Sequence, residues 1–570
     1  MSRSLRLLPV ATLLLVACRP GALGTTSRTD APYDVVITNG RIVDGTGNAW
    51  YRGDVGIRGD RIVRIALPGA LANAKAASRV DARDHIIAPG FIDIQAQSYE
   101  NFLVGDGLAL GMVTQGITTA ILGEGSTPAP LTAHGFAAAA KADTAFGRVG
   151  ASFQGARGFG NWLSAMERHG VSQNVGSFLG TSTVRQYAKD ESMGAPTAAE
   201  LDTMRRVVRD AMRDGAFGLA SALIYPPDNY SSTADLVEMA RAASPFGGVY
   251  ITHMRSEGAK FVEAVDEAIT IGREGRVPVE IYHLKAGGVR NWPKMATVIA
   301  KIDSARAAGQ DVAADMYLYP AGGNALASCF PPKYAEGGKL LARLRDPATR
   351  AEIKAAMLDA TSTEELLCRE ATPSGVMIVG FTKPELKQYE GKRLSEIATA
   401  MGKDWVDTAI ELTLAEEGRL GEILFLMSEE NIRRQLQLPW MKFGTDAGGM
   451  APDPSVGAVH PRTFGNYPRL FGKYVREEKV LPLEDAVRKS SSAVAARLGI
   501  RDRGVIAEGM KADIIVFDAT TIRDRATFEQ PHQLSEGIEQ MWVNGVAVLR
   551  DGKHTGAKPG RVVRGPGYQP

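Results

Sequence analysis

Hydrophobic residues recur at two different spacings in the middle of the chain. Two short apolar runs of strand type end in polar clusters, at Thr252-His253 and at Tyr282-His283. Between them, from Phe261 to Ile271, apolar residues recur every three or four positions with charges between, which is typical of an amphipathic helix. Strand, helix and strand in this order predict a parallel unit. We therefore expect both histidines at one edge of a parallel sheet, where together they can hold one metal ion.

The same alternation of strands and helices continues on both sides of this unit. One helix is expected at 199–214, where apolar residues share a face, and the further strand-like runs lie at 91–94, 118–124, 217–221, 312–317 and 440–446. This pattern predicts an α/β fold with a (β/α)8 TIM-like barrel at 90–499; a doubly wound open sheet is the alternative. A charged, helical stretch at about 331–391 is expected to be an insertion or lid.

Shorter strands with alternating polarity occupy both ends of the chain, at 33–89 and 500–567. Turn signals separate them at Asn39-Gly40, Gly59-Asp60 and Asn544-Gly545. Neither end has enough strands to bury a good core by itself. We expect one small β-sandwich built from both chain ends, next to the barrel.

The first residues have the pattern of an export signal. Arg3 and Arg6 precede an apolar run at 7–17 that is too short to span a membrane as a normal helix. The run ends in Leu15-Val16-Ala17-Cys18, which resembles the lipobox of bacterial lipoproteins. The resemblance implies a signal peptide at 1–17, lipidation of Cys18, a flexible tether at 18–32 and an exported protein anchored at the bacterial cell envelope, in the outer membrane or periplasm. An ordinary cleaved signal is the alternative.

Composition excludes some partners. The formal net charge of +2 gives no support for nucleic-acid binding, so the expected partner is a small molecule, with membrane contact only through the lipid anchor. Cys329 and Cys368, with Cys18, do not make a disulfide framework, and no histidine stands beside them to suggest catalysis. The oligomeric state does not follow from the sequence.

Several motifs together resemble the amidohydrolase superfamily, and within it the N-acyl-D-amino-acid deacylases, or D-aminoacylases. The resemblance covers about residues 33–567, and its motifs lie at 88–93, 114–119, 223–227, 252–255, 281–285, 444–446, 460–462 and 508–514. It implies a metal-dependent barrel beside a β-sandwich made from both chain ends, in agreement with the pattern of strands and helices.

One departure from the family bears on the metal site. Gln95 and Gln97 stand where amidohydrolases carry a metal-binding His-x-His pair. A glutamine amide is a far poorer zinc ligand than imidazole, so the usual binuclear centre is not expected.

The resemblance implies one tightly held zinc instead, bound by a residue of the second barrel strand and by two later histidines. Gly125 stands where the family often has its cysteine, and Glu124 is adjacent. We therefore expect Glu124, His253 and His283 as ligands, with a fourth position open for water. Other divalent metals fit the same ligands.

The remaining roles also follow from the resemblance. Asp446, at the end of the last barrel strand, is expected to be the general acid and base, with a helix N-cap as the alternative. A substrate carboxylate needs cations and hydroxyl donors, and the residues expected to supply them are Lys285, Arg255, Tyr225 and Tyr317, with His460 as a further candidate or a loop anchor. Gly323 replaces a serine of the family, which leaves side-chain recognition open.

Three functions remain in competition. The first is deacylation of N-acyl-D-amino acids or D-aminoacyl dipeptides. The second is hydrolysis of a cyclic amide such as a hydantoin, against which Gln95 and Gln97 argue. The third is an inactive ligand-binding lipoprotein, against which the joint presence of the three metal-ligand candidates and Asp446 argues.

Overall fold

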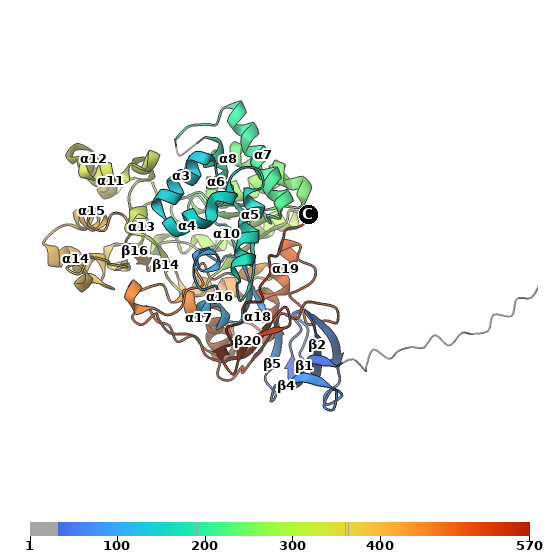
Figure 1. Ribbon diagram of the computed structural model, residues 1–570. Helices are drawn as coiled ribbons and strands as arrows, with labels where there is room; N and C mark the ends of the chain where they lie inside the picture. The colour runs from blue at the N-terminus through green and yellow to red at the C-terminus, as the bar shows by residue number, and fades with distance from the viewer. Residues whose placement is uncertain (1–31, 98, 190–191, 360, 363) are drawn as a thin grey trace, which may run out of the picture.

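The computed structural model describes residues 32–97, 99–189, 192–359, 361–362 and 364–570 (Figure 1). Cys18, the predicted signal peptide and nearly all of the predicted tether lie outside the described residues. Within the described ranges, no helix is long and apolar enough to cross a membrane.

Parallel strands form a closed barrel in the centre of the molecule. Hydrogen bonds join them in two sheets, β6-β7-β8 and β9-β10-β11-β12-β13-β17. The chain passes from β8 to β9 across one residue, and a bridge between Ala96 and Ala447 connects the first strand position to the last. The barrel prediction is confirmed, and the open-sheet alternative is wrong. The strands are β6 (Phe91–Asp93), β7 (Ile117–Leu122), β8 (Asn174–Ser177), β9 (Leu179–Gly180), β10 (Gly218–Ala222), β11 (Val249–His253), β12 (Val279–Ile281), β13 (Val312–Met316) and β17 (Met441–Phe443).

Amphipathic helices cover the outside of the barrel. The helix expected at 199–214 is α7 (Ala198–Asp214), which begins at a capping box between Thr197 and Glu200 and ends at Gly215. Its buried face includes Met204, Val208 and Met212, as the helical spacing predicts. The other helices of this region are α1 (Glu100–Leu103), α2 (Leu110–Val113), α3 (Ala133–Ala142), α4 (Thr144–Val149), α5 (Gly158–His169), α6 (Thr181–Ala188), α8 (Thr233–Ala243), α9 (Phe261–Gly275), α10 (Lys294–Ala307), α16 (Glu429–Leu436), α17 (Arg462–Arg469), α18 (Leu483–Ser490) and α19 (Ser492–Leu498).

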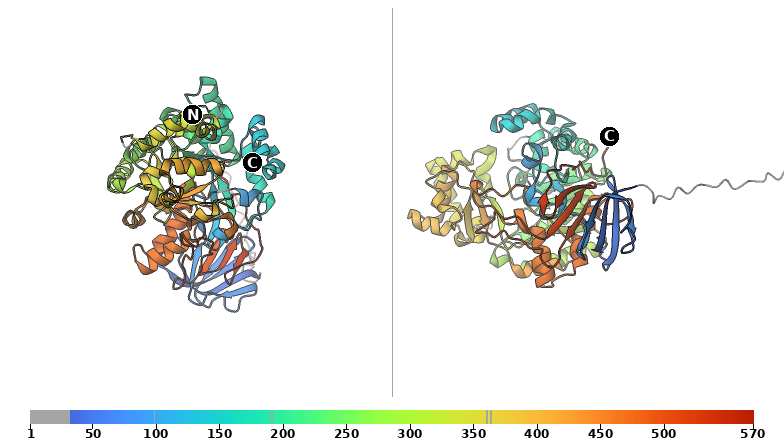
Figure 2. Two further views of the ribbon diagram at one scale, coloured as in Figure 1. Left: turned by 90° about the vertical axis from the view of Figure 1, so that its left-hand side faces the viewer. Right: turned by 60° about the horizontal axis from the view of Figure 1, so that its bottom comes forward.

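The two chain ends share one mixed sheet beside the barrel. They meet where β5 pairs antiparallel with β18, with Ala88 opposite Ile515, and Figure 2 draws the blue and red strands side by side. Gly59-Asp60 and Asn544-Gly545 are hairpin turns, as predicted. Asn39-Gly40 is not: β1 continues through it with a register shift, so this turn prediction is wrong. The strands are β1 (Tyr33–Ile42), β2 (Tyr51–Arg58), β3 (Arg61–Ala66), β4 (Ala76–Asp81), β5 (Ile86–Pro89), β18 (Ile514–Phe517), β19 (Ile538–Val543), β20 (Val546–Arg550) and β21 (Lys553–His554).

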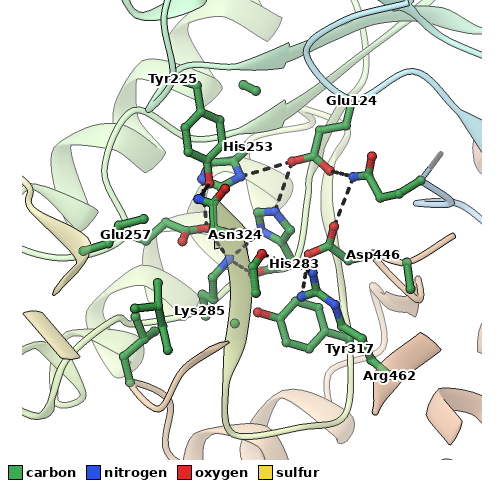
Figure 3. A pocket seen from close by; sticks show the side chains of 18 of the residues that line it. Glu124, Tyr225, His253, Glu257, His283, Lys285, Tyr317, Asn324, Asp446 and Arg462 are labelled. Carbon is green, nitrogen blue, oxygen red and sulfur yellow. Dashed lines mark hydrogen bonds and ion pairs between the residues drawn. The ribbon is translucent and has the colours of Figure 1, made fainter. Parts of the chain in front are cut away.

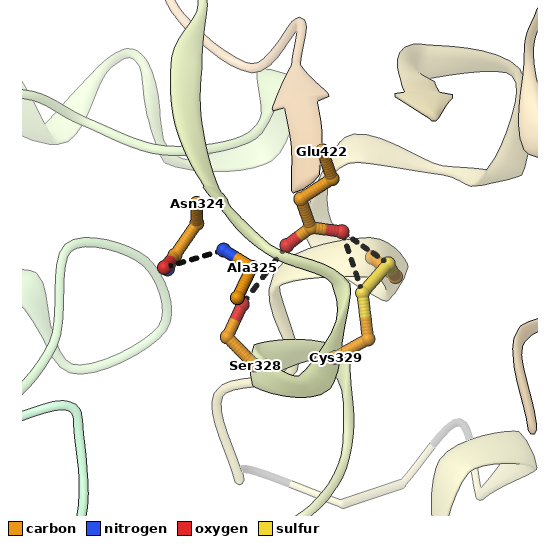
Figure 4. The surroundings of a disulfide bond; sticks show 6 residues. Asn324, Ala325, Ser328, Cys329 and Glu422 are labelled. Atoms are coloured by element: carbon orange, nitrogen blue, oxygen red, sulfur yellow. Dashed lines mark hydrogen bonds between the residues drawn. A yellow bond between two sulfur atoms is a disulfide. The ribbon is translucent and has the colours of Figure 1, made fainter. Parts of the chain in front are cut away.

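A separate unit is inserted between β13 and β17, and we call residues 322–424 the inserted unit. It is longer than the expected 331–391 because it also contains an antiparallel sheet of order β14-β16-β15, whose four-residue strands give little periodicity. A disulfide joins Cys329 and Cys368 within it, a pairing that the sequence did not predict (Figure 4). The elements are β14 (Gly322–Ala325), β15 (Val376–Val379), β16 (Gly421–Leu424), α11 (Leu340–Arg345), α12 (Pro347–Leu358), α13 (Leu367–Ala371), α14 (Leu394–Met401) and α15 (Trp405–Ala415).

Candidate active site

Three predicted metal ligands meet at the carboxyl ends of the barrel strands (Figure 3). His253 is the last residue of β11, and His283 and Glu124 each stand two residues beyond a strand end. Nδ1 of His253 lies 3.1 Å from Glu124 Oε1, and Nε2 of His283 lies 3.3 Å from the same oxygen. The centres of the two imidazole rings are 4.4 Å apart, and one nitrogen of each ring faces this oxygen.

The chemistry of these side chains fits a divalent metal ion. Two imidazole nitrogens and one carboxylate oxygen lie within 4.8 Å of one another and are shielded from solvent. The second ring nitrogen of a ligating histidine needs a polar partner, and Nδ1 of His283 lies 2.8 Å from Lys285 Nζ and 3.1 Å from Glu257 Oε1. Nε2 of His253 is buried without a hydrogen-bond partner among the described residues, and Glu257 Oε1 is its neighbour at 3.8 Å.

The electrostatics of this cluster favour a cation. Burial alone would raise the pKa of Glu124, but His253 and His283 hold it well below its usual value. Burial also works against ionisation of Glu257, yet Lys285 and the two histidines lower its pKa. Two charged carboxylates therefore lie in a buried pocket: Lys285 balances Glu257, and a metal ion can balance Glu124.

Asp446 lies directly beside the ligands, although it is far from them in the sequence (Figure 3). Its Oδ2 is 2.7 Å from Arg462 Nη1, and its Oδ1 accepts a hydrogen bond from Gln97 at 3.1 Å. Asp446 and His283 have backbone φ angles of +50° and +33°, in the left-handed region that side chains with a Cβ seldom adopt. Such strained residues cluster at functional sites, so the backbone supports a role for both.

Gln95 and Gln97 donate hydrogen bonds instead of offering ligands. Their side-chain amides reach Glu124 Oε2 at 2.6 Å and 2.5 Å. The other carboxylate oxygen of Glu124 is left to the two histidines. The amides thus lie where the family's His-x-His pair would be expected.

The predicted substrate contacts separate into two groups. Lys285, Tyr225 and Tyr317 line the pocket. Arg255 does not line it, because its guanidinium binds Glu267 and the backbone carbonyls of residues 229 and 231, so the structure does not bring it to the site. The His460 ring bonds the Ala321 carbonyl at 2.8 Å and accepts the backbone N–H of residue 462, as expected for a loop anchor.

Arg462 is the residue that the sequence reading missed. Its guanidinium lies 4.5 Å from the ring centre of Tyr317 and forms the ion pair with Asp446. The motif at 460–462 contains both His460 and Arg462, and of its residues the arginine lines the pocket. Glu257 was missed as well, although a carboxylate four residues after a candidate ligand histidine could have indicated it.

These residues surround a cavity of about 400 Å³. Metal-ligand candidates and Asp446 lie on the barrel side. The inserted unit contributes the remaining wall, formed by Gly322, Gly323, Asn324, Leu367 and Leu424, and Leu426 stands two residues after the unit ends.

Comparison with known proteins shows which class of protein has this fold and this site. Residues 408–549 match the model of the Amidohydrolase family. A D-aminoacylase of Alcaligenes xylosoxydans xylosoxydans is 34% identical over 533 residues, which are 93% of this chain and 98% of the relative. An N-acyl-D-glutamate deacylase of the same organism is 35% identical over 93% of this chain and 96% of its own length.

Solved structures agree. A D-aminoacylase crystal structure matches with a TM-score of 0.76 and 32% identity, over 94% of this chain and all of that one. The zinc-bound N-acyl-D-glutamate deacylase of Bordetella bronchiseptica matches with a TM-score of 0.75, 30% identity and 94% coverage of this chain. The protein is an amidohydrolase by fold. Within that class, the chain belongs to the D-aminoacylase family. An L-hydantoinase of Arthrobacter aurescens, 15% identical with a TM-score of 0.51, shares the fold alone.

Proposed function

We propose that this protein is a metal-dependent hydrolase that removes the acyl group from N-acyl-D-amino acids. The observation that carries the proposal is the convergence of Glu124, His253 and His283 on one place directly beside Asp446. The preference for the D-configuration rests on the relatives, which are named for D-amino-acid substrates.

The metal is proposed to be a single zinc ion held by Glu124, His253 and His283. When bound there, zinc would supply a Lewis acid for the amide carbonyl and lower the pKa of a bound water. Zinc is present in the related N-acyl-D-glutamate deacylase structure. A single ion is supported by Gln95 and Gln97, whose amides are engaged as donors to Glu124. A related D-aminoacylase has a binuclear metal centre, in which one metal activates and the second attenuates.

Asp446 is proposed to transfer the proton. It would accept a proton from the attacking water and deliver it to the amide nitrogen as the C–N bond breaks, which yields a carboxylic acid and a free amino acid. Its contacts with Arg462 and Gln97 fix the orientation of the carboxylate.

The substrate's own carboxylate is proposed to lie between Arg462 and Lys285. Both cations flank the Tyr317 ring, at 4.5 Å and 5.7 Å from its centre. The Tyr317 hydroxyl adds a neutral donor, and Lys285 stays charged because Glu257 raises its pKa against the effect of burial.

The test is hydrolysis of N-acetyl-D-methionine and N-acetyl-L-methionine by the zinc-loaded protein. We expect turnover of the D-compound only. Asp446→Asn should lower kcat by roughly 10²–10⁴-fold, the usual contribution of a general acid and base, with little change in metal content. Asp202→Asn, at an exposed position, is the matched control. Failure to hydrolyse any of a broad panel of N-acyl-D-amino acids and D-dipeptides would reject the proposal.

We also propose that Cys18 carries a lipid that anchors the exported protein at the cell envelope. The support is the apolar run ending in Leu-Val-Ala-Cys at 15–18. Expressed in a Gram-negative host, the full chain should fractionate with membranes and Cys18→Ala should not. Equal fractionation of both would reject the anchor.

A further inference from the structure

The relatives leave open which D-amino acids this pocket accepts, because they are named for D-amino acids in general, for D-glutamate and for D-aspartate. We infer that this protein acts on N-acyl-D-amino acids with neutral, mainly apolar side chains and discriminates against acidic ones. The inference rests on the proposed deacylase function and specifies its substrate class.

The charges that line the pocket match one substrate carboxylate. Among the described lining residues, the carboxylates are Glu124, Glu257 and Asp446, and the cations are Lys285 and Arg462. With neutral histidines, a bound divalent ion brings the total to one positive charge. A substrate with a single carboxylate balances it. A second carboxylate would add a negative charge that no cation of the described lining compensates, which is costly inside a pocket.

Both lining cations are already engaged by protein carboxylates. Lys285 Nζ is 2.6 Å from Glu257 Oε1, and Arg462 Nη1 is 2.7 Å from Asp446 Oδ2. They can share their charge with the α-carboxylate beside Tyr317. The lining offers no further cation, within the described residues, that could meet a carboxylate on the side chain.

The wall next to this carboxylate site is apolar. Leu424 pairs with Gly322 across β16 and β14, and a Cβ built on Gly322 would lie 3.4 Å from the Tyr317 hydroxyl. Leu426 lies near the segment that carries Lys285. A Cβ built on Gly287, two residues after Lys285, would lie 3.4 Å from Leu426 Cδ1. The α-carboxylate and the side chain leave the same substrate carbon. A substrate held by its carboxylate at Tyr317 therefore places its side chain near this wall.

The side-chain amide of Asn324, on the same strand as Gly322, already has hydrogen-bond partners in the protein. Asn324 donates to the Tyr225 hydroxyl at 2.5 Å and accepts the backbone N–H of Ala325 at 2.8 Å. Gly322 and Gly323 present no side chain. The wall of the inserted unit thus provides apolar surface for a side chain, and the substrate gains most when that side chain is apolar.

The deciding experiment compares kcat/KM for three substrates with the zinc-loaded wild type. N-acetyl-D-glutamine and N-acetyl-D-glutamate have nearly the same shape and differ in charge, and N-acetyl-D-leucine reports apolar fit. We expect kcat/KM to fall in the order leucine, glutamine, glutamate, and to be at least tenfold lower for the glutamate compound than for the glutamine compound. Glutamate turned over as well as glutamine would overturn the inference and leave the deacylase function standing. No turnover of any D-substrate would reject the deacylase function, and this inference with it.

A variant pair tests the wall itself. Leu424→Arg should raise the glutamate-to-glutamine ratio of kcat/KM at least tenfold, because it supplies the missing cation. Leu424→Gln removes the same apolar surface without adding charge and should leave the ratio within about twofold. A folded arginine variant with an unchanged ratio would contradict the placement of the side chain at this wall. Should Leu424→Arg fail to fold, the wild-type comparison decides.

Discussion

At the scale of single residues, Glu124 is shared between two kinds of partner. Its Oε1 faces the histidines, and its Oε2 accepts both glutamine amides. The amide hydrogens thus offset part of the carboxylate's charge on the side away from the histidines. This division supports the proposal that the site holds a single ion.

Replacing the two glutamines with histidines should create a binding site for a second ion. In Gln95→His/Gln97→His, imidazoles next to Glu124 Oε2 and Asp446 Oδ1 would supply nitrogen ligands. We expect metal content at excess zinc to rise from about one to about two ions per chain, measured by mass spectrometry of the metal. Gln95→Asn/Gln97→Asn is the control, because it shortens the amides without adding a ligand. A wild type that already binds two ions would contradict this account.

At the scale of elements, β16 connects the pocket wall to a buried charge. Leu424 lines the cavity, and Glu422, two residues earlier on the same face, is fully buried beside the disulfide and Ser328 (Figure 4). Burial raises the pKa of Glu422 to about 8, and the Ser328 hydroxyl opposes the rise. The folded chain therefore holds this proton more tightly than the unfolded chain does.

The stability of the fold should consequently depend on Glu422 and pH. Because the folded pKa lies above the usual 4.5, its contribution is complete below about pH 4.5 and is lost as the pH rises through about 8. Glu422→Gln cannot ionise. The difference in free energy of unfolding between this variant and the wild type should therefore shift in favour of the variant as the pH rises from 5 to 9. Urea unfolding at several pH values measures this difference.

The exposed Glu385→Gln is the control for this series. A difference between Glu422→Gln and wild type that stays constant from pH 5 to pH 9 would show that Glu422 is not protonated in the folded protein.

At the scale of the whole molecule, one buried carboxylate joins the barrel to the sheet of the chain ends. Asp513 precedes β18, accepts the Asn174 amide of barrel strand β8 at 3.0 Å, and pairs with the buried Arg503. Its other oxygen accepts the backbone N–H of Asn544 at 2.7 Å. Residues from three other segments of the chain, at 174, 503 and 544, thus bind one side chain.

Removal of this carboxylate should destabilise the whole fold. Asp513→Ala removes the buried partner of Arg503, which keeps only the longer contact of its Nε with Asp502 Oδ1 at 3.4 Å, and we expect a loss of about 3–5 kcal/mol in the free energy of unfolding. Asp513→Asn keeps the shape and part of the hydrogen bonding and should lose less. Chemical denaturation followed by circular dichroism measures both, and a loss below about 1 kcal/mol in the alanine variant would contradict the role of this junction.

Periodicity and turn chemistry predicted the barrel, α7 and the two correct hairpins, because those features depend on local sequence. The turn predicted at Asn39-Gly40 was wrong, because a strand can contain an asparagine with positive φ at a local irregularity in its register. Contacts between distant residues did not follow from pattern. Gln97 and Asp446 are 349 residues apart, and only the loop backbone decides that Arg462, and not His460, points into the pocket.

The central claim is that one metal ion, held by Glu124, His253 and His283, carries the activity. The most direct test measures metal per chain and hydrolysis of N-acetyl-D-methionine in the same samples of wild type, His253→Ala and the exposed control His134→Ala. We predict about one zinc and full activity in the wild type and the control, and the loss of both in His253→Ala. A metal-free wild type that is active, or a His253→Ala variant that keeps its metal and its turnover, would contradict the account.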